Sequence, residues 1–239
     1  MSMFCYQCQE ASKGTGCTIK GVCGKTEDVS NLQDLLIDVT KGVAIYAQLG
    51  RDANYKSKAA DKYVFEALFM TITNANFDDN KIIAKCELGI KVREQLKAEL
   101  LKEGIDIPAN LPDCATWTPK NENSFVAKSL LVSILRESNE DIRSLKELLI
   151  YGVKGMAAYA EHAFNLGYEN DEVYAFMHKA LVESTRTDNT VDELVANVLE
   201  CGKFGVDVMA LLDKANTESY GHPELTKVNI GVQDKPGIL

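Results

Sequence analysis

Long apolar runs are absent from this 239-residue sequence, and their absence excludes several classes of protein. No run approaches the roughly 20 apolar residues that a membrane-spanning helix needs, so we expect no membrane association. The opening MSMFCYQCQE has neither a basic nor an apolar segment, which argues against a secretory signal. We therefore expect a cytoplasmic protein. In the cytoplasm, thiols stay reduced or bind metal.

Proline and positive charge are also scarce. Five prolines and 16 glycines are too few for a long disordered tract. The chain carries 26 Lys and Arg against 35 Asp and Glu, a formal net charge of −9. An acidic surface repels phosphate backbones, so we expect no nucleic-acid partner.

Apolar residues recur at helical spacing from about residue 30 onward. We predict a first helix capped by Ser30, a second over residues 58–73 and a third over residues 79–102 that ends at Gly104. Residues 105–123 contain three prolines and no helical period, which predicts a loop. Trp117 is expected to anchor this loop to the helices.

The second half of the chain repeats the first at a constant offset of 113 residues. Nine residues between positions 32 and 47 recur unchanged between positions 145 and 160. The repeat predicts a mostly α fold, in which two three-helix units (28–104 and 124–215) pack as one six-helix domain over residues 28–215. Gly42 and its counterpart Gly155 are expected to let helices approach closely.

The tail, residues 216–239, is predicted to be non-helical. Residues 227–232 alternate and are β-branched, which is typical of a strand. A lone strand leaves its hydrogen-bonding groups unpaired. We therefore expect this segment to be the first strand of a truncated α/β domain.

Residues 1–27 lack periodicity and form a loop rich in cysteine and glycine, with the spacing Cys-x2-Cys-x8-Cys-x5-Cys. Thiolates are soft ligands that select zinc, copper(I) or iron–sulfur centres, and four of them are the usual complement of a [4Fe–4S] cluster. Zinc modules tend to show two short knuckles on hairpins, which this spacing lacks. An iron–sulfur cluster is therefore the favoured interpretation, with zinc as the alternative. The predicted ligands are Cys5, Cys8, Cys17 and Cys23.

Two aromatic residues flank the first cysteines. Phe4 and Tyr6 are expected to shield a cluster from water.

The remaining cysteines and histidines have no predicted role at a metal. Isolated cysteines are typically small buried residues, and histidines without a paired ligand are expected in the core, at the surface or in a turn. These residues are Cys86, Cys114, Cys201, His162, His178 and His222. Thr73, Asn74 and Asn76 are expected to cap a helix end, or to face a cavity of a larger protein.

The stretch FCYQCQEASKGTGCTIKGVCGK resembles the opening of the hybrid cluster proteins, also called prismane proteins, of the hydroxylamine reductase family. Further similar stretches, from NLQDLL to MALLDKANTESYGHPELTKVNIGV, extend the resemblance over the whole chain. It implies that the four loop cysteines hold the proximal cluster. The short spacing resembles the form with a [4Fe–4S] rather than a [2Fe–2S] centre.

The resemblance also implies what lies outside this sequence. In the family, two α/β domains follow and supply the ligands of a hybrid iron–sulfur–oxygen cluster that reduces hydroxylamine or nitric oxide. The first such ligand is a histidine shortly after PGIL, and this sequence ends at Leu239 without it. We therefore expect an electron-transfer region that is inactive alone and has no catalytic residue.

Partners and rival functions follow from the same reasoning. The resemblance implies a small redox protein as electron donor. An apolar face left exposed would favour a homo-oligomer. The rival interpretations are a stand-alone electron carrier, and a structural zinc or helical interaction module without a redox role.

Overall fold

The protein is described by a computed structural model that covers residues 3–8, 10–72, 76–228 and 231. Across these residues the chain is mostly helical, as predicted, and none of the helices there combines the length and apolar character that crossing a membrane requires. The helices are α1 (Glu27–Asp52), α2 (Lys58–Ile72), α3 (Asp79–Lys102), α4 (Asp113–Thr116), α5 (Asn123–Ser129), α6 (Glu140–Asn165), α7 (Asp171–Thr185) and α8 (Val191–Tyr220). Two short 3-10 helices cover Ser12–Gly14 and Ile134–Arg136.

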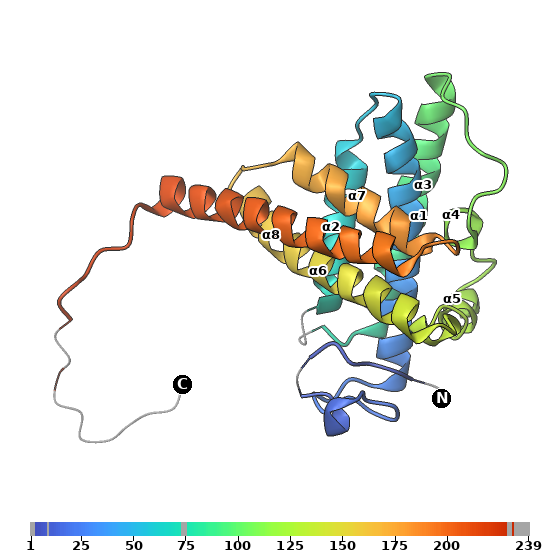
Figure 1. Ribbon diagram of the computed structural model, residues 1–239, viewed down its shortest axis with the longest axis horizontal. Coiled ribbons are helices and arrows are strands. Elements are labelled where there is room, and N and C mark those ends of the chain that lie inside the picture. Colours follow the sequence, from blue (N-terminus) through green and yellow to red (C-terminus); the bar gives the residue numbers. More distant parts are fainter. Residues whose placement is uncertain (1–2, 9, 73–75, 229–230, 232–239) are drawn as a thin grey trace.

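The helices form two similar sets, α1–α2–α3 and α6–α7–α8, as the sequence repeat predicts. Adding 113 to the bounds of α1 and α2 gives the bounds of α6 and α7. Within each set the first helix packs on the third, and between the sets α1 contacts α7 and α2 contacts α6. Figure 1 shows these helices as one bundle, with the N-terminal loop at one end. The division of the chain into domains stays a prediction.

The start of α1 differs from the prediction. The N-cap is Thr26, whose hydroxyl accepts a hydrogen bond from the backbone N–H of Val29 at 3.3 Å. Ser30 lies buried inside the helix instead. The two acidic residues after Thr26 explain the earlier start, because negative charge is favourable beside the N–H groups of a first helical turn.

The segment between the two sets is partly helical, so its prediction as a loop was wrong for residues 113–116. These form α4, which packs on α1. Trp117 anchors the segment as predicted. Its carbonyl accepts a hydrogen bond from the buried guanidinium of Arg93 at 2.9 Å, and its ring packs edge-on against Phe125.

The last helix is longer than predicted, since α8 continues past residue 215 to Tyr220. No proline or glycine interrupts residues 216–220, and Gly221, with a φ of 86°, follows the end. Tyr168 holds this part of α8 by donating a hydrogen bond to Glu218 at 2.6 Å. Of the predicted strand, Lys227, Val228 and Gly231 are described and form none, and its other residues lie outside the described part of the chain.

The two repeated glycines have different surroundings. A Cβ on Gly42 would overlap the carbonyl oxygen of Cys114 and lie 2.8 Å from its carbonyl carbon, so only glycine admits α4 here. A Cβ on Gly155 would meet nothing within 4 Å, and the prediction of close packing there was wrong. The segment after α3 folds back onto α1, whereas the segment after α8 leads away from the bundle (Figure 1).

A buried polar network joins the two helix sets. Arg51, at the end of α1, donates 2.8 Å hydrogen bonds to Asp61 on α2 and to Asp171 on α7. It also donates at 3.2 Å to Nδ1 of His178, which is 1% exposed. Burial lowers the pKa of His178 from 6.5 to about 3, because the imidazolium loses its hydration and lies beside the Arg51 guanidinium. The neutral imidazole therefore serves as an acceptor.

The glycine pair offers a matched test of packing. We expect Gly42→Ala to lower the free energy of unfolding by about 1–3 kcal/mol, because backbone must move to admit the methyl group. Gly155→Ala has free space and gains helix propensity, so we expect up to about 1 kcal/mol of stabilisation. Urea denaturation of both variants measures this, and equal effects at the two positions would contradict the packing described.

His178 predicts a pH dependence of stability. Below pH 6.5 His178 binds a proton in the unfolded chain, whereas in the folded chain it stays neutral down to about pH 3. The free energy of unfolding therefore decreases as the pH is lowered from 6.5 to 3. The contribution is about 1.4 kcal/mol per pH unit. We expect His178→Gln to be less stable than the native protein at pH 7 but to lose less stability on acidification. Exposed His222→Gln serves as the control, and parallel pH curves for His178→Gln and the native chain would refute the assignment.

Candidate metal centre

The cysteine loop is held together by a backbone bridge between two of the predicted ligands. Cys5 and Cys17 pair in antiparallel fashion through hydrogen bonds from Cys5 N–H to Cys17 O at 3.0 Å and from Cys17 N–H to Cys5 O at 2.7 Å. Gly16 precedes the bridge with a φ of 154°, and a Cβ there would lie 2.7 Å from the ring of Phe4. The sequence therefore needs glycine at this position for Phe4 to cover the loop.

Of the other two cysteines, Cys8 lies between the two bridge residues in the chain and Cys23 follows them. The Cys8 carbonyl accepts a hydrogen bond from the N–H of Ala11 at 3.1 Å. Cys23 is exposed in a turn closed by hydrogen bonds between Gly21 and Lys25 and between Gly24 and Gly21. All four are free thiols. In the part of the chain that the structure describes, no three Cys, His, Asp or Glu side chains are grouped to hold a metal ion.

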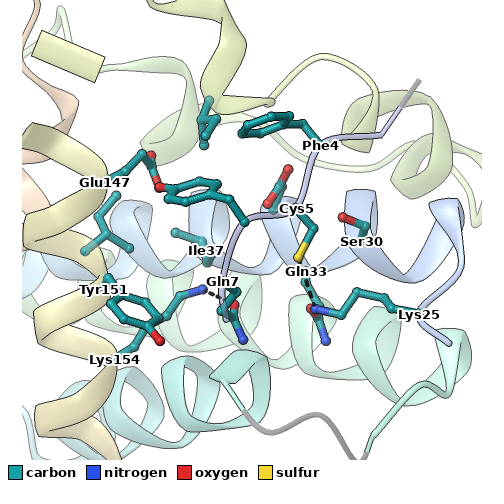
Figure 2. A pocket seen from close by; sticks show the side chains of 14 residues that line it. Phe4, Cys5, Gln7, Lys25, Ser30, Gln33, Ile37, Glu147, Tyr151 and Lys154 are labelled. Atoms are coloured by element: carbon teal, nitrogen blue, oxygen red, sulfur yellow. Dashed lines mark hydrogen bonds between the residues drawn. The ribbon is translucent and has the colours of Figure 1, made fainter. Parts of the chain in front are cut away.

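Two of the sulfur atoms face hydrogen-bond donors. The backbone N–H of Ser12 lies 3.4 Å from the Cys17 sulfur, and the Lys25 ammonium lies 3.8 Å from the Cys5 sulfur. Figure 2 shows Lys25 reaching past Gln33 toward Cys5. Hydrogen-bond donors directed at ligand sulfur atoms stabilise the negative charge of a metal–thiolate centre. The loop therefore suits an anionic thiolate centre in its donor atoms and in the charge around them.

Polar side chains anchor the loop to the bundle. Lys154 on α6 donates to the side-chain oxygen of Gln7 at 2.9 Å, and the Gln7 amide donates to the Thr71 carbonyl on α2 at 2.7 Å. Tyr6 donates to the carboxylate of Glu147 at 3.1 Å. These contacts join two consecutive residues of the loop to both helix sets.

A cavity of about 50 Å³ lies between Cys5 and helices α1 and α6. Asp34, Lys154 and Lys25 line it together with both glutamines, Gln7 and Gln33. Burial raises the pKa of Asp34 above its usual range and lowers that of Lys154 below its own, because each charged form loses hydration, and the attraction between the two groups opposes both shifts. The loop thus rests on an ionisable interior that its own residues help to build.

The sequence interpretation missed Lys25, Gln7 and Lys154 as parts of this site. Lys25 had one signal, since it follows Cys23 by two residues in a stretch without acidic residues, 11–26. The repeat pairs Lys154 with Lys41, but only Lys154 is buried beside the loop. Contacts between residues 147 positions apart, as for Gln7 and Lys154, leave no mark on local spacing.

The remaining cysteines and histidines lie elsewhere. Cys86, Cys114 and Cys201 are buried on α3, α4 and α8, as predicted, and burial raises the pKa values of their thiols to about 12, 12 and 11. His162 packs against Phe69. Because a raised pKa keeps a thiol protonated, Cys86, Cys114 and Cys201 are poor candidates for metal binding.

The predicted polar cluster after α2 is only partly described. The Asn76 side chain accepts a hydrogen bond from the Asp78 N–H at 3.1 Å, close to the start of α3. The N-cap of α3 is Asp78 itself, so the prediction that Asn76 caps a helix end was wrong, and Asn76 closes the turn that precedes the cap. Thr73 and Asn74 lie outside the described residues.

Comparison with known proteins places this geometry in a family. The model of the Prismane/CO dehydrogenase family matches residues 3–239. A protein named hydroxylamine reductase from Desulfitobacterium hafniense (strain DSM 10664 / DCB-2) is 60% identical over 239 residues, which cover all of this chain and 44% of that protein. Proteins of the same name from Clostridium novyi (strain NT) and Clostridium botulinum (strain Langeland) are 59% and 52% identical and are covered to 43% and 46%.

The chain spans less than half the length of these relatives and matches them along its whole length. The resemblance carried by the cysteine block and the helical motifs is thereby confirmed. The chain belongs to the Prismane/CO dehydrogenase family.

Proposed function

We propose that this chain is the electron-transfer region of a cytoplasmic hydroxylamine reductase and that Cys5, Cys8, Cys17 and Cys23 hold one [4Fe–4S] cluster. The observation that carries the proposal is four free thiols on one loop, with a donor directed at the sulfur of Cys17 and another at that of Cys5. When bound, such a cluster stores and releases single electrons.

The spacing of the cysteines favours a cluster over a single zinc ion. Four cysteines are the usual complement of a [4Fe–4S] cluster. Structural zinc sites tend to use two short Cys-x2-Cys knuckles, whereas in this chain five residues separate Cys17 from Cys23.

The other loop residues support this role without taking part in chemistry. Phe4 covers Gly16 and packs against Tyr6 at a ring separation of 5.5 Å, which limits access of water to the Cys5 side of the loop. Gln7 and Lys154 fix the loop on the bundle. The chain's own part is therefore to hold the cluster, shield it and set its electrostatic surroundings.

For the longer protein, we propose that electrons taken up at this loop pass to a second centre outside the present chain. The relatives that the chain matches are named hydroxylamine reductase, and it covers less than half of each. Reduction of hydroxylamine or nitric oxide would take place at that second centre. The chain alone would bind and exchange electrons without turning over either substrate.

The electron donor, in this proposal, is a small acidic redox protein. The loop exposes Ile19 and Val22, which are 85% and 62% accessible, next to the exposed Cys23. Residues 11–26 include no acidic residue and two exposed lysines, Lys13 and Lys20, although the whole chain has a net charge of −9. A local positive charge around an apolar centre complements a partner with a negative face.

Elemental analysis tests the cluster assignment. After anaerobic purification and reconstitution, we expect about four iron and four sulfide per chain and broad absorption near 400 nm. Cys17→Ser should lose most of this iron, whereas Cys114→Ser, on a buried cysteine outside the loop, should retain it. Stoichiometric zinc with no iron or sulfide would refute the proposal in favour of the structural module.

The docking surface predicts a charge-dependent rate. Lys20→Glu should slow reduction of the cluster by a reduced acidic ferredoxin roughly tenfold at low salt and weaken the salt dependence, because steering by charge is lost. Exposed Lys102→Glu, at the end of α3, carries the same charge change and should have little effect. Equal slowing in both variants would show that only net charge matters and would refute docking at the loop.

A further inference from the structure

Lys25 is a buried ammonium group whose direct contacts are a neutral amide oxygen and a predicted ligand sulfur. It is 1% exposed, and its nitrogen donates to the Gln33 side-chain oxygen at 2.7 Å. Within the described residues it forms no ion pair with a carboxylate. The remaining partner is the Cys5 sulfur at 3.8 Å. Burying a cation is costly unless strong acceptors compensate it, so the Gln33 oxygen and the Cys5 sulfur hold the ammonium in this position.

The position of Lys25 is fixed from several sides. Gln33 projects from the rigid helix α1, and its own amide nitrogen is buried without a hydrogen-bond partner. Gly21 donates its N–H to the Lys25 carbonyl at 2.8 Å, and a Cβ on Gly21 would lie 2.9 Å from the Lys25 Cβ. The turn that carries Cys23 therefore wraps around Lys25 and aims its side chain across the loop at Cys5 (Figure 2).

Other charges near the loop do not replace Lys25. Asp34 and Lys154 line the same cavity and have opposite signs, so their effects on the loop oppose each other. Glu147 accepts a hydrogen bond from Tyr6 on the far side of the cavity. Lys25 is the charge in direct contact with a predicted ligand sulfur.

We infer that Lys25 is a positioning residue that holds Cys5 in place and raises the reduction potential of the bound cluster. The inference rests on the proposed function. Reduction adds one electron, supplied by the donor protein, and no bond is made or broken. A fixed positive charge at a ligand sulfur stabilises the more negative, reduced state more than the oxidised one. The sequence context of the four cysteines does not by itself indicate this residue.

The test is an equilibrium redox titration of the reconstituted 239-residue chain, followed by absorption and by electron paramagnetic resonance. Lys25→Met keeps the length of the side chain and removes its charge. At the midpoint potential of the native chain, we expect the ratio of reduced to oxidised cluster to fall about tenfold, which is about 59 mV for one electron. Lys13→Met removes an exposed, solvent-screened charge from the same loop and should change the ratio less than about twofold.

Two further variants decide the case where Lys25→Met fails to assemble a cluster. Lys25→Arg keeps the charge and should restore a potential close to that of the native chain. Gln33→Glu keeps Lys25 and places a carboxylate beside its ammonium, so it should lower the potential in the same direction as Lys25→Met.

An unchanged midpoint in loaded Lys25→Met or Gln33→Glu would overturn the inference. A native chain that binds no iron and sulfide would instead overturn the proposed function. The two failures are therefore distinguishable by metal and sulfide content.

Discussion

The cysteine loop is ordered by the polar side chains that it buries against the helices. Apart from the Cys5–Cys17 bridge, no β-pairing supports it in the described part of the chain, and all its cysteines are free. Its order therefore depends on Gln7 between α6 and α2 and on Lys25 against α1. Each buried donor needs its acceptor, because an unpaired buried polar group costs about 1–3 kcal/mol. These contacts fix the loop on the bundle through side chains that are not predicted metal ligands.

The bundle that supports the loop is a duplicated scaffold used asymmetrically. Helices α1 and α6 have the same length and nine identical residues at an offset of 113. Only Gly42 of the two glycines is pressed by a neighbouring backbone, since α4 has no counterpart beside α6 in the part of the chain that the structure describes. The repeat gives the protein two similar helical layers, and the segments outside the repeat decide which surface of each layer is covered.

This arrangement suits the proposed electron-transfer role. The loop lies at one end of the bundle (Figure 1), with Cys23 exposed and Cys17 buried. The proposed centre would thus have one side open to a donor and one side against a polar interior. The apolar residues exposed along α8, Leu199, Val206 and Met209, lie at helical spacing on a different element from the loop. Lys25 and Gln7 then set the surroundings of Cys5, the predicted ligand that lines the cavity between the loop and the helices.

Much of the architecture was determined by the sequence alone. Periodicity predicted α3 to the residue, the repeat predicted the paired helix sets, and the cysteine block predicted the family. These features are local or repeated, and a one-dimensional pattern records them directly. The start of α1 and the end of α8 were misplaced by several residues, because capping by Thr26 and the hydrogen bond to Tyr168 compete with the period.

Only the tertiary structure decided which side chains meet. That Gly42 is crowded while Gly155 is free, that His178 is an acceptor for Arg51, and that Lys25 reaches Cys5 all depend on packing between distant segments. A charged side chain reads from sequence as solvent-exposed, since burial of a lysine without a paired carboxylate is rare. The fold overrides that expectation at Lys25, because a turn and a helix enclose its side chain beside a sulfur and an amide oxygen that accept hydrogen bonds from its ammonium.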